Sequence, residues 1–276
     1  MQLTPRYDGP TLLHIDDAVG NPAVPMLRQR RRLVEHLRTL DDEQWRMPSR
    51  CDGWTVQDVV SHLVSVDQFW GMSIGAGLAG TPTRFLATFD PVATPAQLVD
   101  RTQGLPAAEV LDSFAAGVDA LAATVADLDV TSLSTIAEAP PGHVAMRAVL
   151  LHALWDAWIH ERDILVPLGI AQALEADEVT CCLAYAAALG PALTASMGST
   201  REGSLVVQAT DPDVVVVVDA GSTVTVRLGG TRGEPHLRGP AVDLVDALSF
   251  RAPFPTPIDD EHQWLVGGLA VAFDRA

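Results

Sequence analysis

Residues 53–70, GWTVQDVVSHLVSVDQFW, form the most strongly patterned stretch of this sequence. Thr55 and Asp58 match the S/T-x-x-D/E pattern that caps a helix N-terminus, and the Val and Leu residues after them recur at helical spacing. The stretch therefore predicts an amphipathic helix that begins near Thr55. Such a helix buries one apolar face against other helices, so neighbouring segments should carry matching patterns.

Three further segments carry the same kind of apolar face. PMLRQRRRLVEHLRTL (25–40) has its Leu and Val residues along one stripe, and residues 106–128 begin with Pro at a first helical position. A fourth helix is expected from about residue 143 to 168. Loops are expected over 75–95 and over 129–142, where Gly and Pro are frequent. Four amphipathic helices joined by loops predict an antiparallel bundle.

The pattern changes after residue 203. Residues 203–228 are rich in Val and Thr, alternate in STVTVRL and contain the turn signals DPD and AGS, so they predict hairpin-linked strands. Helical periodicity returns over 239–251 and is weaker over 259–273. Residues 170–200 are expected to form a helix that links the two halves.

These segments together predict an α+β fold with two domains. An antiparallel four-helix bundle is expected over residues 1–185, and a smaller α+β domain over residues 186–276. The sequence is 48% hydrophobic, which is enough to fill a core of this size, and it contains no internal repeat.

Charge and hydropathy limit the partners. The net charge of −17 repels phosphate backbones, and the basic run RQRRR (28–32) lies inside a predicted helix, so nucleic acid is not expected as a partner. No run approaches the roughly 18 apolar residues of a membrane helix, and MQLTPRYDGP (1–10) lacks the features of a signal peptide. We therefore expect a cytoplasmic protein without a membrane partner. Every basic residue is Arg, which suggests a GC-rich source such as an actinobacterium.

The three cysteines do not indicate a disulfide-bonded or zinc-stabilised fold. Cys51, Cys181 and Cys182 form no C-x-x-C motif and are odd in number, so neither a disulfide scaffold nor a structural zinc site is predicted. We interpret Cys181 and Cys182 as small buried hydrophobic residues.

A second stretch, DAWIHERDI (156–164), carries polar groups within a helix that otherwise looks buried. Asp156 and His160 stand one turn apart, about 5–6 Å from each other on one face, and can reach a single divalent metal. His62, in the middle of the capped helix, is the best candidate for a third ligand. Two imidazoles and one carboxylate leave a coordination position open, as in catalytic zinc sites.

Several neighbours allow two interpretations. His152 precedes Asp156 by four residues and is interpreted as a supporting or structural residue, because three ligands over two turns would strain the outer pair. Asp163 either accepts the second imidazole proton of a ligand or forms an exposed ion pair with Arg162 or Arg147. Trp54, Trp155 and Trp158 either line a cleft or simply fill the core.

Both stretches resemble a known family. CDGWTVQDVVSHL (51–63) and LWDAWIHERDI (154–164) are similar to the paired signatures of the mycothiol-dependent maleylpyruvate isomerase family, within the DinB-like superfamily of metal-binding four-helix bundles. The resemblance implies that His62, Asp156 and His160 are metal ligands. The family commonly has Glu where this chain has Asp156, whose carboxylate reaches one methylene less far.

The resemblance extends to the C-terminal half, where GPAVDLVDALSFR (239–251) is similar to a segment of the family's sterol-carrier-like domain. There, Arg251 is the match to an Arg of the substrate pocket, with Arg238 as the alternative. Arg251 is therefore expected to be catalytic, and both arginines to bind the cosubstrate or an anionic substrate. The implied cofactors are a divalent metal, with Zn²⁺ favoured, and mycothiol.

The resemblance implies an isomerase or S-transferase. A metal ionises a bound thiol, and the thiolate then attacks a small electrophile. Two His and one carboxylate also suit a zinc hydrolase or a non-haem Fe(II) oxygenase, and a non-catalytic, metal-stabilised binding protein is a further alternative. The sequence identifies neither the electrophile nor whether the protein is a monomer or a homodimer.

Overall fold

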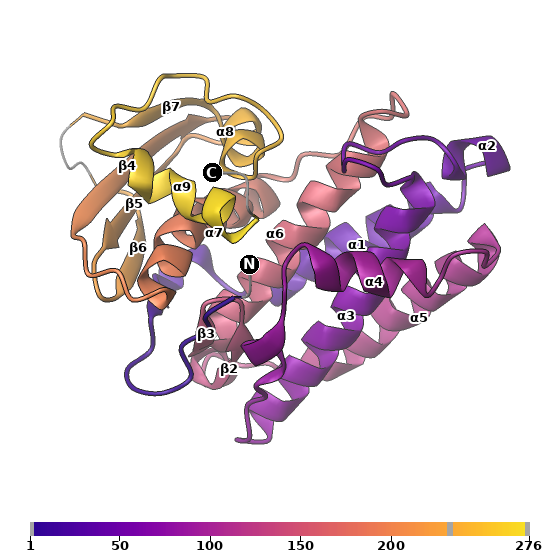
Figure 1. Cartoon of the computed structure of the whole chain (residues 1–276), viewed down its shortest axis with the longest axis horizontal. Coiled ribbons are helices and arrows are strands. Elements are labelled where there is room, and N and C mark those ends of the chain that lie inside the picture. Colours follow the sequence, from indigo (N-terminus) through magenta and orange to yellow (C-terminus); the bar gives the residue numbers. More distant parts are fainter. Residues whose placement is uncertain (1–2, 231–233, 274–276) are drawn as a thin grey trace.

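The N-terminal part of the chain is a bundle of four long helices. The computed structural model describes residues 3–230 and 234–273. The bundle helices are α1 (Ala23–Leu37), α3 (Val56–Leu78), α5 (Ala107–Val125) and α6 (Met146–Leu165) (Figure 1). Helices α1 and α3 each pack against both α5 and α6. The predicted bundle is confirmed.

Helix α3 begins where the capping pattern predicts. The Thr55 hydroxyl accepts the Asp58 backbone N–H, and the Asp58 carboxylate accepts the Thr55 backbone N–H at 2.9 Å. Pro48 and Thr55 form a β-bridge, and the short helix α2 (Asp42–Trp45) precedes this turn. Because both ends of the cap are satisfied, the register of α3, and with it the position of His62, is fixed by residues next to it in sequence.

Two predicted loops contain regular structure. The loop expected over 75–95 contains the end of α3, a 3₁₀ turn and the start of helix α4 (Ala93–Asp100), and the hairpin of β2 (Ile136–Ala139) and β3 (Gly142–Ala145) fills the second. The hairpin packs against α3, where a Cβ added to Gly77 would lie 2.7 Å from the Cβ of Ala137. Four-residue strands are too short for a clear alternation, so the sequence pattern missed them.

The C-terminal half contains a five-stranded sheet with the order β1-β6-β5-β4-β7. Its strands are β4 (Gly203–Thr210), β5 (Val214–Ala220), β6 (Val224–Leu228), β7 (Leu237–Pro240) and the N-terminal β1 (Leu13–Ile15). Strands β4, β5 and β6 form the predicted antiparallel hairpins. Strand β1 pairs in parallel with β6, so the beginning of the chain completes the sheet of the second half, which the sequence did not suggest.

Helix α7 (Ala176–Ser196) connects the two halves. It packs against α6 on the bundle side, and against β5, β6, α8 (Ala241–Leu248) and α9 (Gln263–Ala272) on the other. By length and composition α7 alone among the described helices could cross a membrane, but 83% of its apolar window is buried in protein, as in a core helix. The boundary expected after residue 185 falls within α7, and the division into domains stays a prediction.

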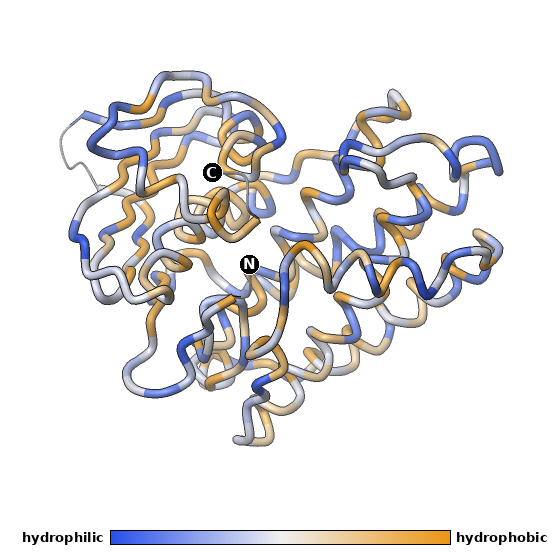
Figure 2. The backbone as a smooth tube through the Cα atoms, viewed as in Figure 1, coloured by the Kyte–Doolittle hydropathy of each residue, from blue (hydrophilic) through white to orange (hydrophobic). Residues whose placement is uncertain are grey.

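The core runs through both halves. One cluster of buried apolar side chains joins α6, α7, the sheet and the β2–β3 hairpin, and a second fills the far end of the bundle around Trp45 and Phe114. Figure 2 shows hydrophobic residues recurring along the helices and strands, whereas the chain around α2 is largely hydrophilic. Helix α6 contributes to both clusters and is therefore buried on most sides. Polar residues on α6 consequently need specific partners. The described residues also form three short 3₁₀ turns: Asp17–Val19, Phe85–Thr88 and Ser132–Ser134.

Candidate metal centre

The three expected ligands lie together. The potential ligand atoms of His62, Asp156 and His160 are all within 4.8 Å of one another. The two imidazole rings are 4.9 Å apart between centroids and nearly perpendicular, and His160 Nε2 is 3.7 Å from Asp156 Oδ1. The arrangement joins one residue of α3 to two residues on successive turns of α6.

The antiparallel packing of α3 and α6 produces this meeting. His62 contacts His160, and Trp70, eight residues further along α3, contacts His152, eight residues earlier on α6. A step of eight residues forward on α3 thus matches a step of eight residues back on α6, as expected for antiparallel helices. Asp156 lies midway along α6 between His152 and His160.

The cluster fits a divalent cation. His62 Nδ1 and Asp156 Oδ2 are buried and have no hydrogen-bond partner in the described part of the chain, which costs free energy unless another group satisfies them. Burial and the nearby His160 lower the pKa of His62 well below its usual value, so its imidazole stays neutral, as a metal ligand must. Burial raises the pKa of Asp156, an effect that a bound cation would reverse.

Asp163 orients one of the expected ligands. Its Oδ2 lies 3.0 Å from His160 Nδ1, so Nδ1 is occupied and Nε2 is left on the side of Asp156. Burial opposes ionisation of this carboxyl, but His160 and Arg251 hold its pKa well below the usual range. Burial likewise opposes protonation of His160, but the hydrogen bonds with Asp163 and Cys51 raise its pKa to about 10, so a cation that binds here must displace a proton from this imidazole. Of the two interpretations of Asp163, the geometry supports the hydrogen bond to the imidazole.

Asp163 also binds two arginines. Arg50 Nε donates to it at 3.0 Å, and Arg251 donates through Nε and Nη2, each at 2.9 Å. The two arginines predicted as ion-pair partners of Asp163 pair elsewhere, Arg162 with Asp246 and Arg147 with Asp17.

Cys51 is a neighbour that the sequence did not single out. Its Sγ lies 3.1 Å from Asp163 Oδ2, 3.7 Å from His160 Nδ1 and 3.6 Å from Arg251 Nη2. Cys51, His160 and Asp163 are also close enough to hold a metal, but the Asp163 oxygens already accept hydrogen bonds from two arginines. We therefore interpret Cys51 and Asp163 as support for the first cluster, to which His160 belongs. The position of Cys51, four residues before the capping residue Thr55, was the available signal.

The two expected arginines lie in different places. Arg251 reaches the centre through Asp163, and its side chain is 19% exposed. Its Nε and Nη2 both bind Asp163 and Nη1 donates to the Ser249 carbonyl, so its guanidinium fork is already occupied. Arg238 is exposed on β7, and no hydrogen bond among the described residues links it to the cluster.

Ion pairs lock the C-terminal half onto this centre. Asp246 on α8 accepts both Arg50, at 3.0 and 3.1 Å, and Arg162, at 2.7 and 3.1 Å. Arg50 thus bridges Asp246 and Asp163. Because Arg251 follows α8 directly, these pairs fix the position at which its guanidinium meets the bundle.

The three tryptophans differ in role. Trp54 lies 5.3 Å from the His62 ring between centroids and borders the cluster. Trp155 is 8% exposed and donates from Nε1 to the Ser249 hydroxyl at 2.9 Å. Trp158 is fully buried core. Of these three, Trp54 is the one that borders the cluster.

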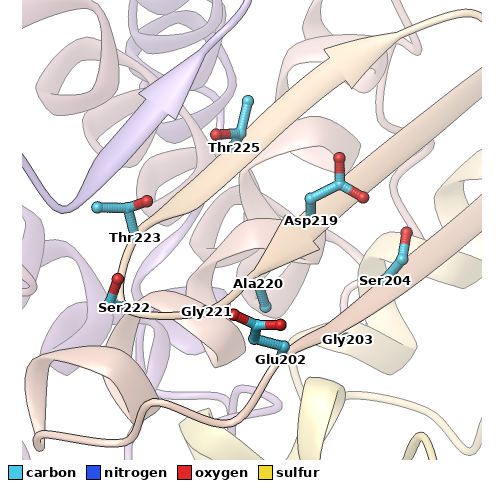
Figure 3. A pocket seen from close by; sticks show the side chains of 9 residues that line it. All are labelled: Glu202, Gly203, Ser204, Asp219, Ala220, Gly221, Ser222, Thr223 and Thr225. Atoms are coloured by element: carbon cyan, nitrogen blue, oxygen red, sulfur yellow. The ribbon is translucent and has the colours of Figure 1, made fainter.

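A separate hollow lies at one end of the sheet. Its lining is mostly small, hydroxyl-bearing or acidic: Glu202, Gly203, Ser204, Asp219, Ala220, Gly221, Ser222, Thr223 and Thr225 (Figure 3). It is open and shares no residue with the metal cluster, and Asp219 is paired with Arg227. We assign the chemistry to the buried cluster because it brings together three potential metal ligands, two of which have a buried atom without a hydrogen-bond partner among the described residues.

Replacing Asp163 by Asn is expected to lower metal affinity about 10- to 100-fold, the usual loss when a group that orients a histidine ligand is removed. The variant also leaves two partly buried arginines without their shared carboxylate. Metal competition with a chromophoric chelator measures the change. The matched control is Asp8→Asn, which breaks an exposed ion pair with Arg84. Equal affinities of the Asp163 variant and the wild type would contradict the orienting role.

His152 predicts a pH dependence of stability. Burial lowers its pKa to about 3, from 6.5 in the unfolded chain. Between these pH values the unfolded state binds one more proton than the folded state. The contribution of His152 to the free energy of unfolding is therefore fully present above pH 6.5, and it declines by about 1.4 kcal/mol per pH unit as the pH falls. Urea unfolding between pH 7 and 4 should therefore show a steeper decline for wild type than for His152→Gln. If the free energy of unfolding falls equally with pH in both proteins, His152 does not contribute to the pH dependence.

The fold and the cluster define a class of protein: a helical bundle with a two-His, one-carboxylate centre, covered by an α+β half that contributes an arginine. The family model described as Mycothiol maleylpyruvate isomerase N-terminal domain matches residues 26–165, just over half of the chain. The chain belongs to this family, as the sequence signatures suggested.

Solved structures agree with this assignment at the level of the fold. Two crystal structures of the mycothiol-dependent maleylpyruvate isomerase, one of them of a mutant, superpose with TM-scores of 0.60 and 0.59. Each is 12% identical to this chain, and the match covers 84% of this chain and 88% of the other. Among curated protein sequences none matches. The predicted α+β class is confirmed.

Proposed function

We propose that this chain is a metal-dependent enzyme that uses mycothiol to attack a small electrophile, either isomerising it or forming a thioether. The observation that carries the proposal is the cluster of His62, Asp156 and His160, in which two buried polar atoms lack partners. Membership of the family supports mycothiol as the thiol. Zn²⁺ suits two imidazoles and one carboxylate with a position left open.

A divalent metal in this cluster would ionise a bound thiol at neutral pH. The residues around the cluster orient a ligand, limit access of water and place a positive charge nearby. Asp163 keeps His160 turned toward Asp156, and the closely packed helices limit access of water. Arg251 places positive charge beside the centre, where it would favour an anionic substrate. Because Asp163 accepts from Nε and Nη2 of Arg251, and the Ser249 carbonyl accepts from Nη1, Arg251 would offer a substrate one N–H of Nη1 rather than a two-point contact.

The alternatives have less support. A zinc hydrolase needs an acid near the open position, but Glu161 on α6 faces away and is bound by Arg32 and Gln172. An Fe(II) oxygenase would use the same three ligands, so the cluster alone does not separate it from a thiol enzyme. A binding protein would hold the thiol without consuming it. Cytoplasmic location, and a monomer or homodimer, stay predictions.

The test is to load the protein with Co²⁺ and titrate mycothiol while recording the sulfur-to-cobalt charge-transfer band. A saturable band that is absent from His62→Ala supports the proposal. Cys51→Ser is the second control, because a band already present before the thiol is added would come from that residue. No thiol-dependent band in fully metallated wild type would overturn the thiol mechanism and favour the hydrolase.

A further inference from the structure

His152 occupies an aromatic pocket one turn from the metal cluster. Its ring centroid is 4.9 Å from Trp70, 5.3 Å from Trp155 and 5.1 Å from Tyr185. The residue is 8% exposed, so the pocket is nearly but not entirely closed. None of these side chains serves the proposed metal site, and a histidine is an unusual choice where an apolar ring would pack equally well.

The position along α6 relates His152 to the cluster. His152, Asp156 and His160 follow one another at four-residue steps, which corresponds to about 6 Å of helix rise per step. Trp70 of α3 packs against His152, and His62 of α3 packs against His160. Along α6, Asp156 therefore lies between these two pairs of rings. A small molecule that reacts at the cluster would therefore lie about one helical turn from His152.

The hydrogen bond to Tyr185 fixes the tautomer of His152. The Tyr185 hydroxyl lies 2.6 Å from His152 Nδ1, and within residues 3–230 and 234–273 it has no other hydrogen bond. A buried hydroxyl needs an acceptor, and burial keeps Tyr185 protonated by raising its pKa well above the usual value. Tyr185 therefore donates to Nδ1. The neutral imidazole then carries its own proton on Nε2, which makes no hydrogen bond to the described residues.

We propose that His152 Nε2–H donates a hydrogen bond to a neutral carbonyl oxygen of the electrophile. The inference rests on the proposed function and adds a residue that contacts substrate. The pocket around His152 is aromatic and uncharged, whereas the arginine lies at the other end, next to Cys51 and Asp163. The geometry therefore favours an electrophile with a neutral carbonyl at one end, and places any carboxylate at the other.

The chemistry balances without another reactant. The thiolate sulfur forms a bond to the carbon β to the carbonyl, the C=C π bond breaks, and its electron pair moves onto the carbonyl oxygen. That oxygen becomes an enolate while it accepts the Nε2–H hydrogen bond, and the proton stays on His152. Isomerisation reverses these steps after rotation about the former double bond. Thioether formation instead takes one proton from water at the α-carbon.

Nitrogen-15 NMR of histidine-labelled protein tests the tautomer without any substrate. The expected spectrum at pH 7 has a protonated Nε2 and an unprotonated Nδ1 for His152, assigned by loss of these signals in His152→Gln. Tyr185→Phe is expected to mix the two tautomers, since it removes the donor to Nδ1. A proton on Nδ1 in the wild type would overturn the proposal.

A single-turnover comparison tests the contact with substrate. The Co²⁺ protein with bound mycothiol is mixed with acrylamide, which has a neutral carbonyl, or with benzyl chloride, which has no oxygen, and loss of the charge-transfer band is followed. His152→Phe is expected to slow the acrylamide reaction about 100-fold, as typical for a lost oxyanion donor, and to leave the benzyl chloride reaction unchanged. His152→Gln, which keeps an N–H at a similar reach, should restore part of the rate.

Each other outcome is decisive. Equal slowing with both electrophiles would assign His152 a structural role and overturn the proposal, as would unchanged rates with both. If wild type gives no thiol-dependent band, the proposed function fails first, and the NMR result still reports separately on the tautomer.

Discussion

Replacing Asp156 by Asn is expected to leave the purified protein with almost no metal. Loss of a group that only supports a ligand lowers metal affinity by up to about 100-fold, and loss of a ligand itself should lower it further. Asp156 supplies the only negative charge among the three expected ligands, and Asn keeps its shape without the charge. Metal content after dialysis, measured by mass spectrometry, is the first readout. Retention of one equivalent of metal would remove Asp156 from the ligand set.

The same variant makes an opposite prediction for the metal-free protein. Burial raises the pKa of Asp156, so its charge is unfavourable when no cation is present. Metal-free Asp156→Asn should therefore be at least as stable to urea as metal-free wild type, whereas added Zn²⁺ should stabilise only the wild type. A general disruption of the fold would instead destabilise the variant in both conditions.

Two controls bracket this result. Glu35→Gln makes the same chemical change at an exposed position of α1 and should leave metal content unchanged. Asp156→Glu adds the methylene that the family resemblance led us to expect, and metal should be retained if the backbones of α3 and α6 adjust to the longer side chain. Loss of metal from the Glu variant would show that the spacing of the two helices is matched to Asp.

The sequence predicted the helices well because their signals are local. The Thr55–Asp58 cap and the apolar periodicity depend on residues within a few positions of one another, and α3 begins where they indicate. Strand β1 had no such signal. Three residues, Leu13–Ile15, define a strand only because β6, more than two hundred residues later, offers an edge for parallel pairing.

The same distinction separates the parts of the site. Asp156 and His160 could be paired from a four-residue spacing, and His62 followed from the second helix and the family signature. The contacts around Asp163 join the adjacent residues 50 and 51 to residues 163 and 251, so three distant parts of the chain meet there. No spacing rule connects them, because their meeting depends on how α8 packs against the bundle.

The basic run in α1 shows how context changes the meaning of charge. Arg28, Arg30 and Arg32 all bind acids within the protein, among them Asp67, Glu161 and Glu178. The net charge of the sequence argues against nucleic acid as a partner. The structure shows instead that these arginines of the basic run form ion pairs inside the protein. Alternate arginines of α1 are ion-pair partners that hold α1 against α3, α6 and α7.

Among these pairs, Arg30–Asp67 gives the largest expected effect on stability. Both side chains are fully buried, and Arg30 donates to Asp67 Oδ1 through Nε at 2.9 Å and Nη2 at 2.8 Å. Arg30 Nη2 also donates to the Ala153 carbonyl on α6 at 3.1 Å, so the pair joins three bundle helices. Asp67→Ala should lower the free energy of unfolding by about 3–5 kcal/mol, since it leaves a buried cation without its partner. Urea unfolding at pH 7 measures this.

The double variant Arg30→Met, Asp67→Ala separates the cost of a lone charge from the value of the pair. Removing both charges eliminates the desolvated cation, so the double variant should regain most of the stability that Asp67→Ala loses. Because Ala153 lies three residues before Asp156 on α6, the double variant should also retain metal. If it is as unstable as the single variant, the loss comes from packing among α1, α3 and α6, and the buried ion pair contributes little beyond filling space.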